Sequence, residues 1–146
     1  MVRSLYKITN VNQMDPFLMT ITSGDDHWMY LSSTGCLTAG RKKAEHALFP
    51  YVTDDLLHRN NHFTGPVTVI RIKEDKRTKV WCPFSRYKES YEKEQNLHKN
   101  SLGNIVIFEE INHSLGLTFF YEWQSSAKYG FIRKSRLVNH HSNTLN

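Results

Sequence analysis

One segment near the carboxyl end of the chain limits the possible folds more than any other. Large apolar residues recur at every second position from Leu117 to Trp123. Successive side chains of a β-strand point to opposite faces, so this spacing predicts a strand with one buried face. The expected core face consists of Leu117, Phe119, Tyr121 and Trp123, and the opposite face of Thr118, Phe120 and Glu122.

Other short segments also have the β-branched and aromatic content of strands, and turns rich in Gly, Asn and charged residues separate them. The expected strands are Leu5–Ile8, Phe17–Thr22, His27–Ser32, Val67–Lys73, Val80–Cys82, Ile105–Phe108 and Tyr129–Arg133. For Tyr87–Asn96 the residues alone leave two readings open, because the Lys and Glu content favours helix by propensity. The chain is therefore expected to be all-β, an antiparallel β-sandwich with a long irregular loop and at most one or two short helices, forming a single domain over residues 1–146.

The stretch from Gly24 to Asp55 carries the densest mixture of aromatic, acidic, glycine and basic residues. After the expected strand His27–Ser32, the turn signals Thr34-Gly35 and Ala39-Gly40 predict irregular structure. A short helix is expected from Thr53, which can cap its start. A connection with so many large apolar groups is expected to be packed and functional.

The composition argues against several classes of protein. The 146 residues include 19 Lys and Arg against 14 Asp and Glu, but the two signs alternate along the chain, which is typical of a solvated surface and not of a nucleic-acid-binding stripe. Cys36 and Cys82 lack metal-type spacing and are expected to be reduced. Met1 to Lys7 has no signal-peptide core and no apolar run is long enough to span a bilayer, so we expect a cytoplasmic protein.

The acidic and histidine residues do not form a recognisable catalytic or metal motif. Glu109 and Glu110 should point to opposite faces of a strand, and Asp25-Asp26 and Asp54-Asp55 are better explained as turn or helix-start residues. His58 and His62 have the spacing of two ligands on one helix face but lack the glutamate of a metalloprotease helix. No catalytic residue, metal site or cofactor is predicted within the chain.

Sugar binding has better chemical support. Aromatic faces stack on the CH groups of sugar rings, and carboxylates and other polar groups bind the hydroxyls. The candidate binding residues are Trp28, Arg41, Phe49, Tyr51, Asp54 and Asp55. The competing interpretation, which the residues alone favour, places Trp28, Tyr30 and Phe49 in the core and pairs Arg41 with a nearby aspartate.

Three segments in the same order carry a resemblance to a known family. GCLTAGRKKAEHALFPYVTDD is followed by TGPVTVIRI and later by GNIVIFEEINHSLGLTFFYEW. Together they resemble the amino-terminal region of cellobiose-phosphorylase-like proteins, over nearly the whole chain. Such proteins are much longer and place an amino-terminal β-sandwich before a helical catalytic barrel, which the 146 residues do not contain.

The resemblance implies a supporting role in a glycoside phosphorylase, glycosyltransferase or glycoside hydrolase. The sandwich would pack on the barrel of the same longer chain, border a sugar or oligosaccharide site, and contact a second subunit in a homodimer. It also implies an extended conformation from Tyr91 onward. Phosphate and water both remain open as the acceptor, and the segment alone is expected not to be catalytic. The alternatives are a free-standing carbohydrate-binding or protein-interaction β-module and, less favoured, a nucleic-acid-associated β-protein.

Overall fold

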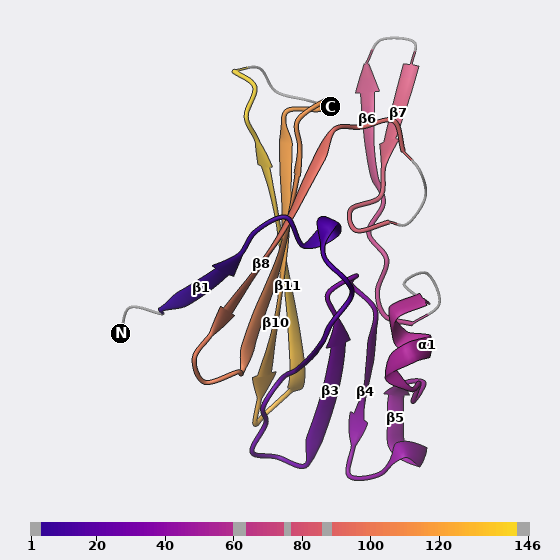
Figure 1. Ribbon diagram of the computed structural model, residues 1–146, viewed down its shortest axis with the longest axis vertical. Helices are drawn as coiled ribbons and strands as arrows, with labels where there is room; N and C mark the ends of the chain where they lie inside the picture. Colours follow the sequence, from indigo (N-terminus) through magenta and orange to yellow (C-terminus); the bar gives the residue numbers. More distant parts are fainter. Residues whose placement is uncertain (1–3, 60–63, 75–76, 86–88, 143–146) are drawn as a thin grey trace.

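The computed structural model describes residues 4–59, 64–74, 77–85 and 89–142. These residues form two antiparallel sheets packed face to face, a separate two-stranded sheet and one α-helix (Figure 1). The predicted all-β sandwich is confirmed.

The first sheet has five strands in the order β1-β8-β9-β10-β11. The long hairpin of β10 and β11 pairs Leu117 with Asn139 at one end and Ser126 with Gly130 at the other. The four alternating residues of the expected core face, Leu117, Phe119, Tyr121 and Trp123, are all buried, as predicted. The five strands are β1 (Leu5–Ile8), β8 (Lys93–Asn100), β9 (Ile105–Asn112), β10 (Leu117–Ser126) and β11 (Gly130–Asn139).

Strand β8 covers the last four residues of the segment Tyr87–Asn96 that had two interpretations, so the extended conformation expected from Tyr91 begins at Lys93, after a bend at Ser90 and Tyr91. Its residues are extended, because β8 pairs with β1 along one edge and with β9 along the other. Two ladders of backbone hydrogen bonds outweigh the modest helix propensity of Lys and Glu. The start of the segment at Tyr87 and Lys88 lies outside the described residues.

The second sheet has four strands in the order β2-β3-β4-β5. Its last two strands, β4 and β5, lie in the stretch that was expected to be irregular. The pair Ala39-Gly40, which was expected to form a turn, is part of β4. The paired chains leave no room for a side chain at Gly40, which accounts for a glycine at a strand position. The four strands are β2 (Leu18–Thr20), β3 (His27–Ser32), β4 (Leu37–Arg41) and β5 (Ala47–Phe49), with the 3-10 turns η1 (Val11–Gln13) and η2 (Ala44–His46) beside them.

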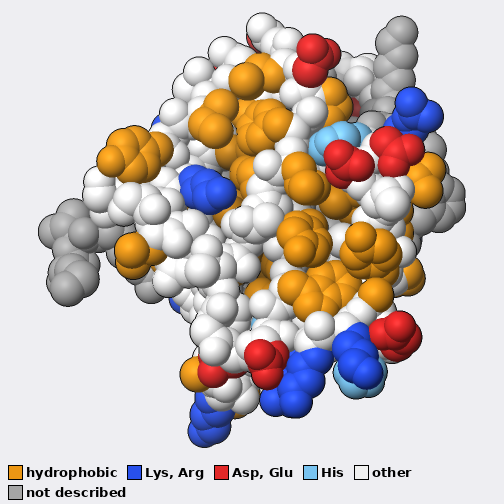
Figure 2. Space-filling model, turned by 60° about the horizontal axis from the view of Figure 1, so that its bottom comes forward, with side chains coloured by type: hydrophobic (Ala, Val, Ile, Leu, Met, Phe, Trp, Pro, Cys, Tyr) orange, Lys and Arg blue, Asp and Glu red, His pale blue; other side chains and the backbone are white. Residues whose placement is uncertain are grey.

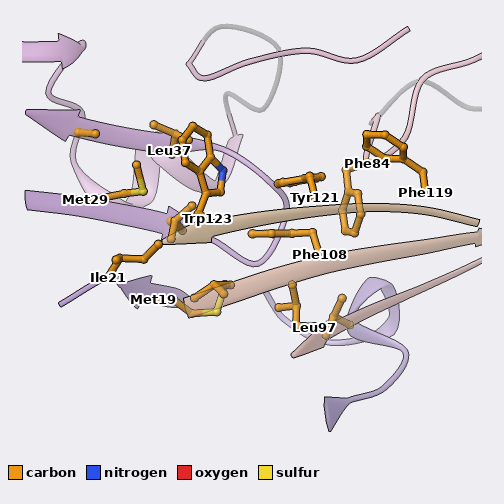
Figure 3. Packing of buried hydrophobic residues seen from close by; sticks show 14 of the residues in the cluster. Met19, Ile21, Met29, Leu37, Phe84, Leu97, Phe108, Phe119, Tyr121 and Trp123 are labelled. Carbon is orange, nitrogen blue, oxygen red and sulfur yellow. The ribbon is translucent and has the colours of Figure 1, made fainter. Parts of the chain in front are cut away.

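Large apolar side chains from both sheets meet in one core (Figure 3). Met29 and Leu37 of the four-stranded sheet lie near Trp123 of the five-stranded sheet. Further along, Phe108 and Tyr121 stack with ring centroids 4.5 Å apart. Both rings belong to the five-stranded sheet, and offset stacking of this kind adds to the burial of apolar area in stabilising its inner face.

The remaining two strands, β6 (Ile70–Glu74) and β7 (Arg77–Trp81), form a hairpin beside this core (Figure 1). Trp81 joins the hairpin to the core, because its fully buried ring lies edge-on to Phe119 at 6.4 Å. The expected short helix is present as α1 (Asp54–Arg59), which packs on β3 through the fully buried Leu57. Within the described residues, neither Cys36 nor Cys82 forms a disulfide bond.

Candidate functional site

The outer face of the four-stranded sheet carries large aromatic side chains. On β3, Met29 and Leu31 point into the core, so the alternation of the strand directs Trp28 and Tyr30 outward. The two rings lie 6.1 Å apart at a tilt of 32°. Tyr30 is 36% exposed and Trp28 is half-buried, so both rings reach the surface.

Gly40 creates the space in which the Trp28 ring lies. Trp28 pairs with Gly40 across β3 and β4, and a Cβ at Gly40 would overlap the Trp28 ring. The same Cβ would come within 2.8 Å of Ala47 Cα and the His46 carbonyl oxygen, which are backbone atoms. The glycine therefore sets the depth at which Trp28 lies on the sheet.

Tyr51 completes the group from a different part of the chain. Its ring lies 6.0 Å from Trp28 at an angle of 78°, and its side chain is 57% exposed. Thr38 Oγ1 donates a 2.7 Å hydrogen bond to the Pro50 carbonyl oxygen, which fastens the segment before Tyr51 to β4. We call Trp28, Tyr30 and Tyr51 the aromatic patch. Around the lower end of the molecule, hydrophobic side chains reach the surface together, bordered by acidic and basic groups (Figure 2).

Asp54 and Asp55 follow Tyr51 at the start of α1, and both are exposed. Asp54 Oδ1 accepts a 2.9 Å hydrogen bond from the Asp55 backbone N–H. Thr53 Oγ1 donates to Asp55 Oδ1 at 2.7 Å, and this bond is the main reason that the pKa of Asp55 lies below its ordinary value. Asp55 is therefore ionised at neutral pH and able to accept hydrogen bonds, whereas a general acid requires a raised pKa.

Two of the six candidate residues lie away from the aromatic patch. Phe49 pairs with Ala39 and packs half-buried against the core, so it contributes to stability. Arg41 is exposed at the end of β4, in a polar recess that Asp25 and Asp26 also line. The expected ion pair of Arg41 with an aspartate is not formed within 4.0 Å among the described residues.

The adjacent glutamates of β9 point to opposite faces, as their spacing predicts. Glu110 is fully buried and accepts hydrogen bonds from Trp81 and Gln95 side chains. Glu109 lies on the outer face, where it binds Lys7 at 3.0 Å. Burial alone would raise the pKa of Glu109, but hydrogen bonds from Lys7, Asn96 and His98 together hold that pKa below its ordinary value.

Of the two histidines with metal-ligand spacing, only His58 lies within the described residues. Nδ1 of His58 lies 2.8 Å from Ser32 Oγ, an interaction that holds α1 on the sheet, and His62 falls outside the described residues. Among the residues that the structure describes, no group of three His, Cys, Asp or Glu side chains is arranged to hold a metal ion. Within the same residues, no helix has the length and apolar character needed to cross a membrane.

The structure thus brings Trp28, Tyr51, Asp54 and Asp55 to one side of the molecule, with Tyr30 beside Trp28. Tyr30 carried a signal in the sequence, because it falls two residues after Trp28 on the same face of a predicted strand. The chain matches no protein-family model and no curated protein.

Proposed function

We propose that the chain is a carbohydrate-binding β-sandwich that serves as the amino-terminal domain of a cellobiose-phosphorylase-like protein. The observation that carries the proposal is the aromatic patch, in which Trp28 contacts two other exposed rings on the outer face of a sheet. Exposed ring faces bind the CH groups of a sugar, and the carboxyl oxygens of Asp54 and Asp55 beside Tyr51 can accept hydrogen bonds from its hydroxyls. The three ordered segments that resemble this family give the proposal its second support.

In this proposal the chemistry belongs to a catalytic barrel and not to the sandwich. Inverting cleavage of a glycosidic bond needs one carboxylic acid with a raised pKa and a second carboxylate across the sugar. The carboxyl groups of Asp55 and Glu109 have lowered pKa values, which is the opposite requirement. We expect the 146-residue chain to release no sugar 1-phosphate from a β-linked glucose disaccharide in the presence of phosphate. Turnover that disappears in Asp54→Asn would contradict this placement of the chemistry.

The binding test is titration of the chain with cello-oligosaccharides by calorimetry. Trp28→Ala and Tyr51→Ala should each raise Kd by about three- to tenfold, from about 0.5–1.5 kcal/mol for an aromatic contact. Tyr6→Ala is the matched control, because Tyr6 is a 64% exposed tyrosine on β1 of the other sheet. Equal effects of the Tyr6 and Tyr51 substitutions, or no binding by the wild-type chain, would contradict the proposal.

A second candidate function is a protein-interaction surface on the same side of the molecule. It is favoured by Leu48 on β5 and Leu56 on α1, whose side chains are 74% and 47% exposed. Apolar groups at the surface are typical of interaction sites when they are contiguous. Under this alternative, Leu48→Ser would change the solution mass of the chain at high concentration, whereas Trp28→Ala would leave sugar titrations unchanged.

A further inference from the structure

A half-buried arginine on the inner face of the five-stranded sheet has no acidic partner among the residues that the structure describes. Arg133 pairs with Trp123 across β10 and β11, so it shares the inward face of the sheet. Its guanidinium carbon lies 4.7 Å from the centre of the Tyr121 ring. The ring face attracts the cation, but it carries no net charge.

The hydrogen bonds of the guanidinium go only to neutral groups. Nη1 donates to Ser135 Oγ and Nη2 to Thr68 Oγ1, each at 3.0 Å, and the buried Nε has no partner. Among the described residues no carboxylate lies within 4.0 Å of Arg133. Burial lowers the pKa of Arg133, because the charged form loses solvation in this position. A charge withdrawn from water is normally paired, so this arrangement is costly without an anion.

The guanidinium lines a small cavity of about 70 Å³ between the β10–β11 hairpin and the segments around Gly35 and Phe84. Tyr121 and the hydroxyl residues Thr34, Thr68 and Ser85 also line this cavity. Burial raises the pKa of Tyr121, so its phenol stays protonated and can donate a hydrogen bond. A Cβ at Gly35 would lie 3.0 Å from the Tyr121 hydroxyl oxygen, so a side chain there would crowd this group.

We propose that this cavity binds a small oxyanion, a phosphate, sulfate or carboxylate group, with Arg133 as its cationic ligand. Three features of the cavity, as the described part of the chain forms it, support this choice: a cation with no carboxylate within 4.0 Å, hydroxyl groups around it, and no acidic residue in its lining. Arg presents N–H groups in a planar fork that suits the two oxygens of a carboxylate or phosphate. The volume is too small for a sugar ring, and the lining includes no member of the aromatic patch. The site is therefore independent of the proposed sugar function.

The proposal is tested on the whole chain by NMR, through the Nε–H resonance of Arg133. Inorganic phosphate and acetate are titrated separately against a chloride background of constant ionic strength. We expect a saturable shift of the Arg133 resonance with at least one of the two anions. Saturation by acetate alone would identify a carboxylate ligand, and saturation by phosphate alone a phosphoryl or sulfuryl group. This measurement needs no variant, so it remains decisive if Arg133 variants fail to fold.

Calorimetry on variants supplies the second test. Arg133→Gln should raise Kd for the anion by at least about tenfold, because charge-assisted hydrogen bonds are lost. Arg136→Gln is the matched control, since Arg136 lies on the same strand and 4.4 Å from the Phe120 ring, but on the outer face of the sheet. Phosphate and sulfate stabilise proteins in general by exclusion from their surfaces, so only the difference between the two variants counts. Equal Kd values for the two variants, or an Arg133 resonance that does not respond to either anion, would overturn the proposal.

Discussion

Replacing Glu110 with Gln should destabilise the protein by about 3 kcal/mol, through loss of the acceptor that joins the β6–β7 hairpin to the core. The carboxylate is fully buried, and its oxygens accept three short hydrogen bonds. Oε1 accepts from Trp81 Nε1 at 2.7 Å, and Oε2 accepts from the Phe84 backbone N–H at 2.7 Å and from Gln95 Nε2 at 2.6 Å.

The magnitude follows from counting donors and acceptors. In either orientation of the new glutamine side chain, its NH2 group faces at least one of these donors. The least costly orientation places this NH2 group against Trp81 Nε1, which then has no acceptor. One buried N–H left without an acceptor costs about 1–3 kcal/mol, and the two surviving bonds lose their charge assistance at about 0.5–1 kcal/mol each. For a domain of this size, about 3 kcal/mol corresponds to a fall in Tm of about 10 °C.

The assay is urea unfolding followed by tryptophan fluorescence, with Tm from calorimetry. Glu109→Gln is the matched control, because it removes the same charge from the adjacent residue on the outer face of the sheet. Glu109 is itself mostly buried and accepts a 2.9 Å hydrogen bond from Asn96 Nδ2, but its charged partner Lys7 is 40% exposed, so we expect a smaller loss there, of about 1–2 kcal/mol. A loss below about 1 kcal/mol for Glu110→Gln, or an equal loss in the two variants, would refute the assignment of Glu110 as the buried acceptor.

Three further outcomes are expected. Phe119→Ala should cost about 3–5 kcal/mol in urea unfolding, because it empties a buried position on the alternating face; a cost below about 1 kcal/mol would contradict a core role. Gly40→Ala should cost about 1–3 kcal/mol and change the emission of Trp28, because the methyl group overlaps that ring and the backbone of the next strand; unchanged emission would count against the packing described. The folded-state pKa of Glu109 is depressed, so the contribution of Glu109 to stability is present above its ordinary pKa of 4.5 and is lost as pH falls through the lower folded value. Glu109→Gln should therefore flatten the acid limb of a curve of stability against pH. An unchanged acid limb would argue against this contribution.

The fold was predictable where side-chain alternation is strong. The residues from Leu117 to Trp123 mark their strand and its buried face without further information. The same local signals fail for β4, because Gly40 is typical of a turn until its cross-strand neighbour Trp28 is known. A glycine that makes room for a neighbouring ring cannot be told from a turn glycine by sequence alone.

The candidate site was predictable in its residue types and less so in its grouping. Trp28 and Tyr51 are distant in sequence, and their contact depends on the hydrogen bond from Thr38 to the Pro50 carbonyl. Arg41 was expected to pair with an aspartate, but it lies exposed at the end of β4. An exposed ion pair gains little free energy after side-chain ordering, so proximity in sequence gave weak grounds for expecting it.

The two outer faces of the sandwich differ in a way that bears on where a ligand can bind. On the five-stranded sheet, Lys7 is paired with Glu109 and Lys134 with Glu122, at 3.0 and 3.7 Å, so these charges have partners within the chain. On the four-stranded sheet, the rings of the aromatic patch contact one another and expose part of their surface. Covering apolar ring surface is favourable by about 25 cal/mol per Å², whereas a ligand that displaces paired charges must first replace their interactions. Under the proposed function, we therefore expect a sugar, whose ring has one apolar side and polar edges, to bind on the four-stranded sheet.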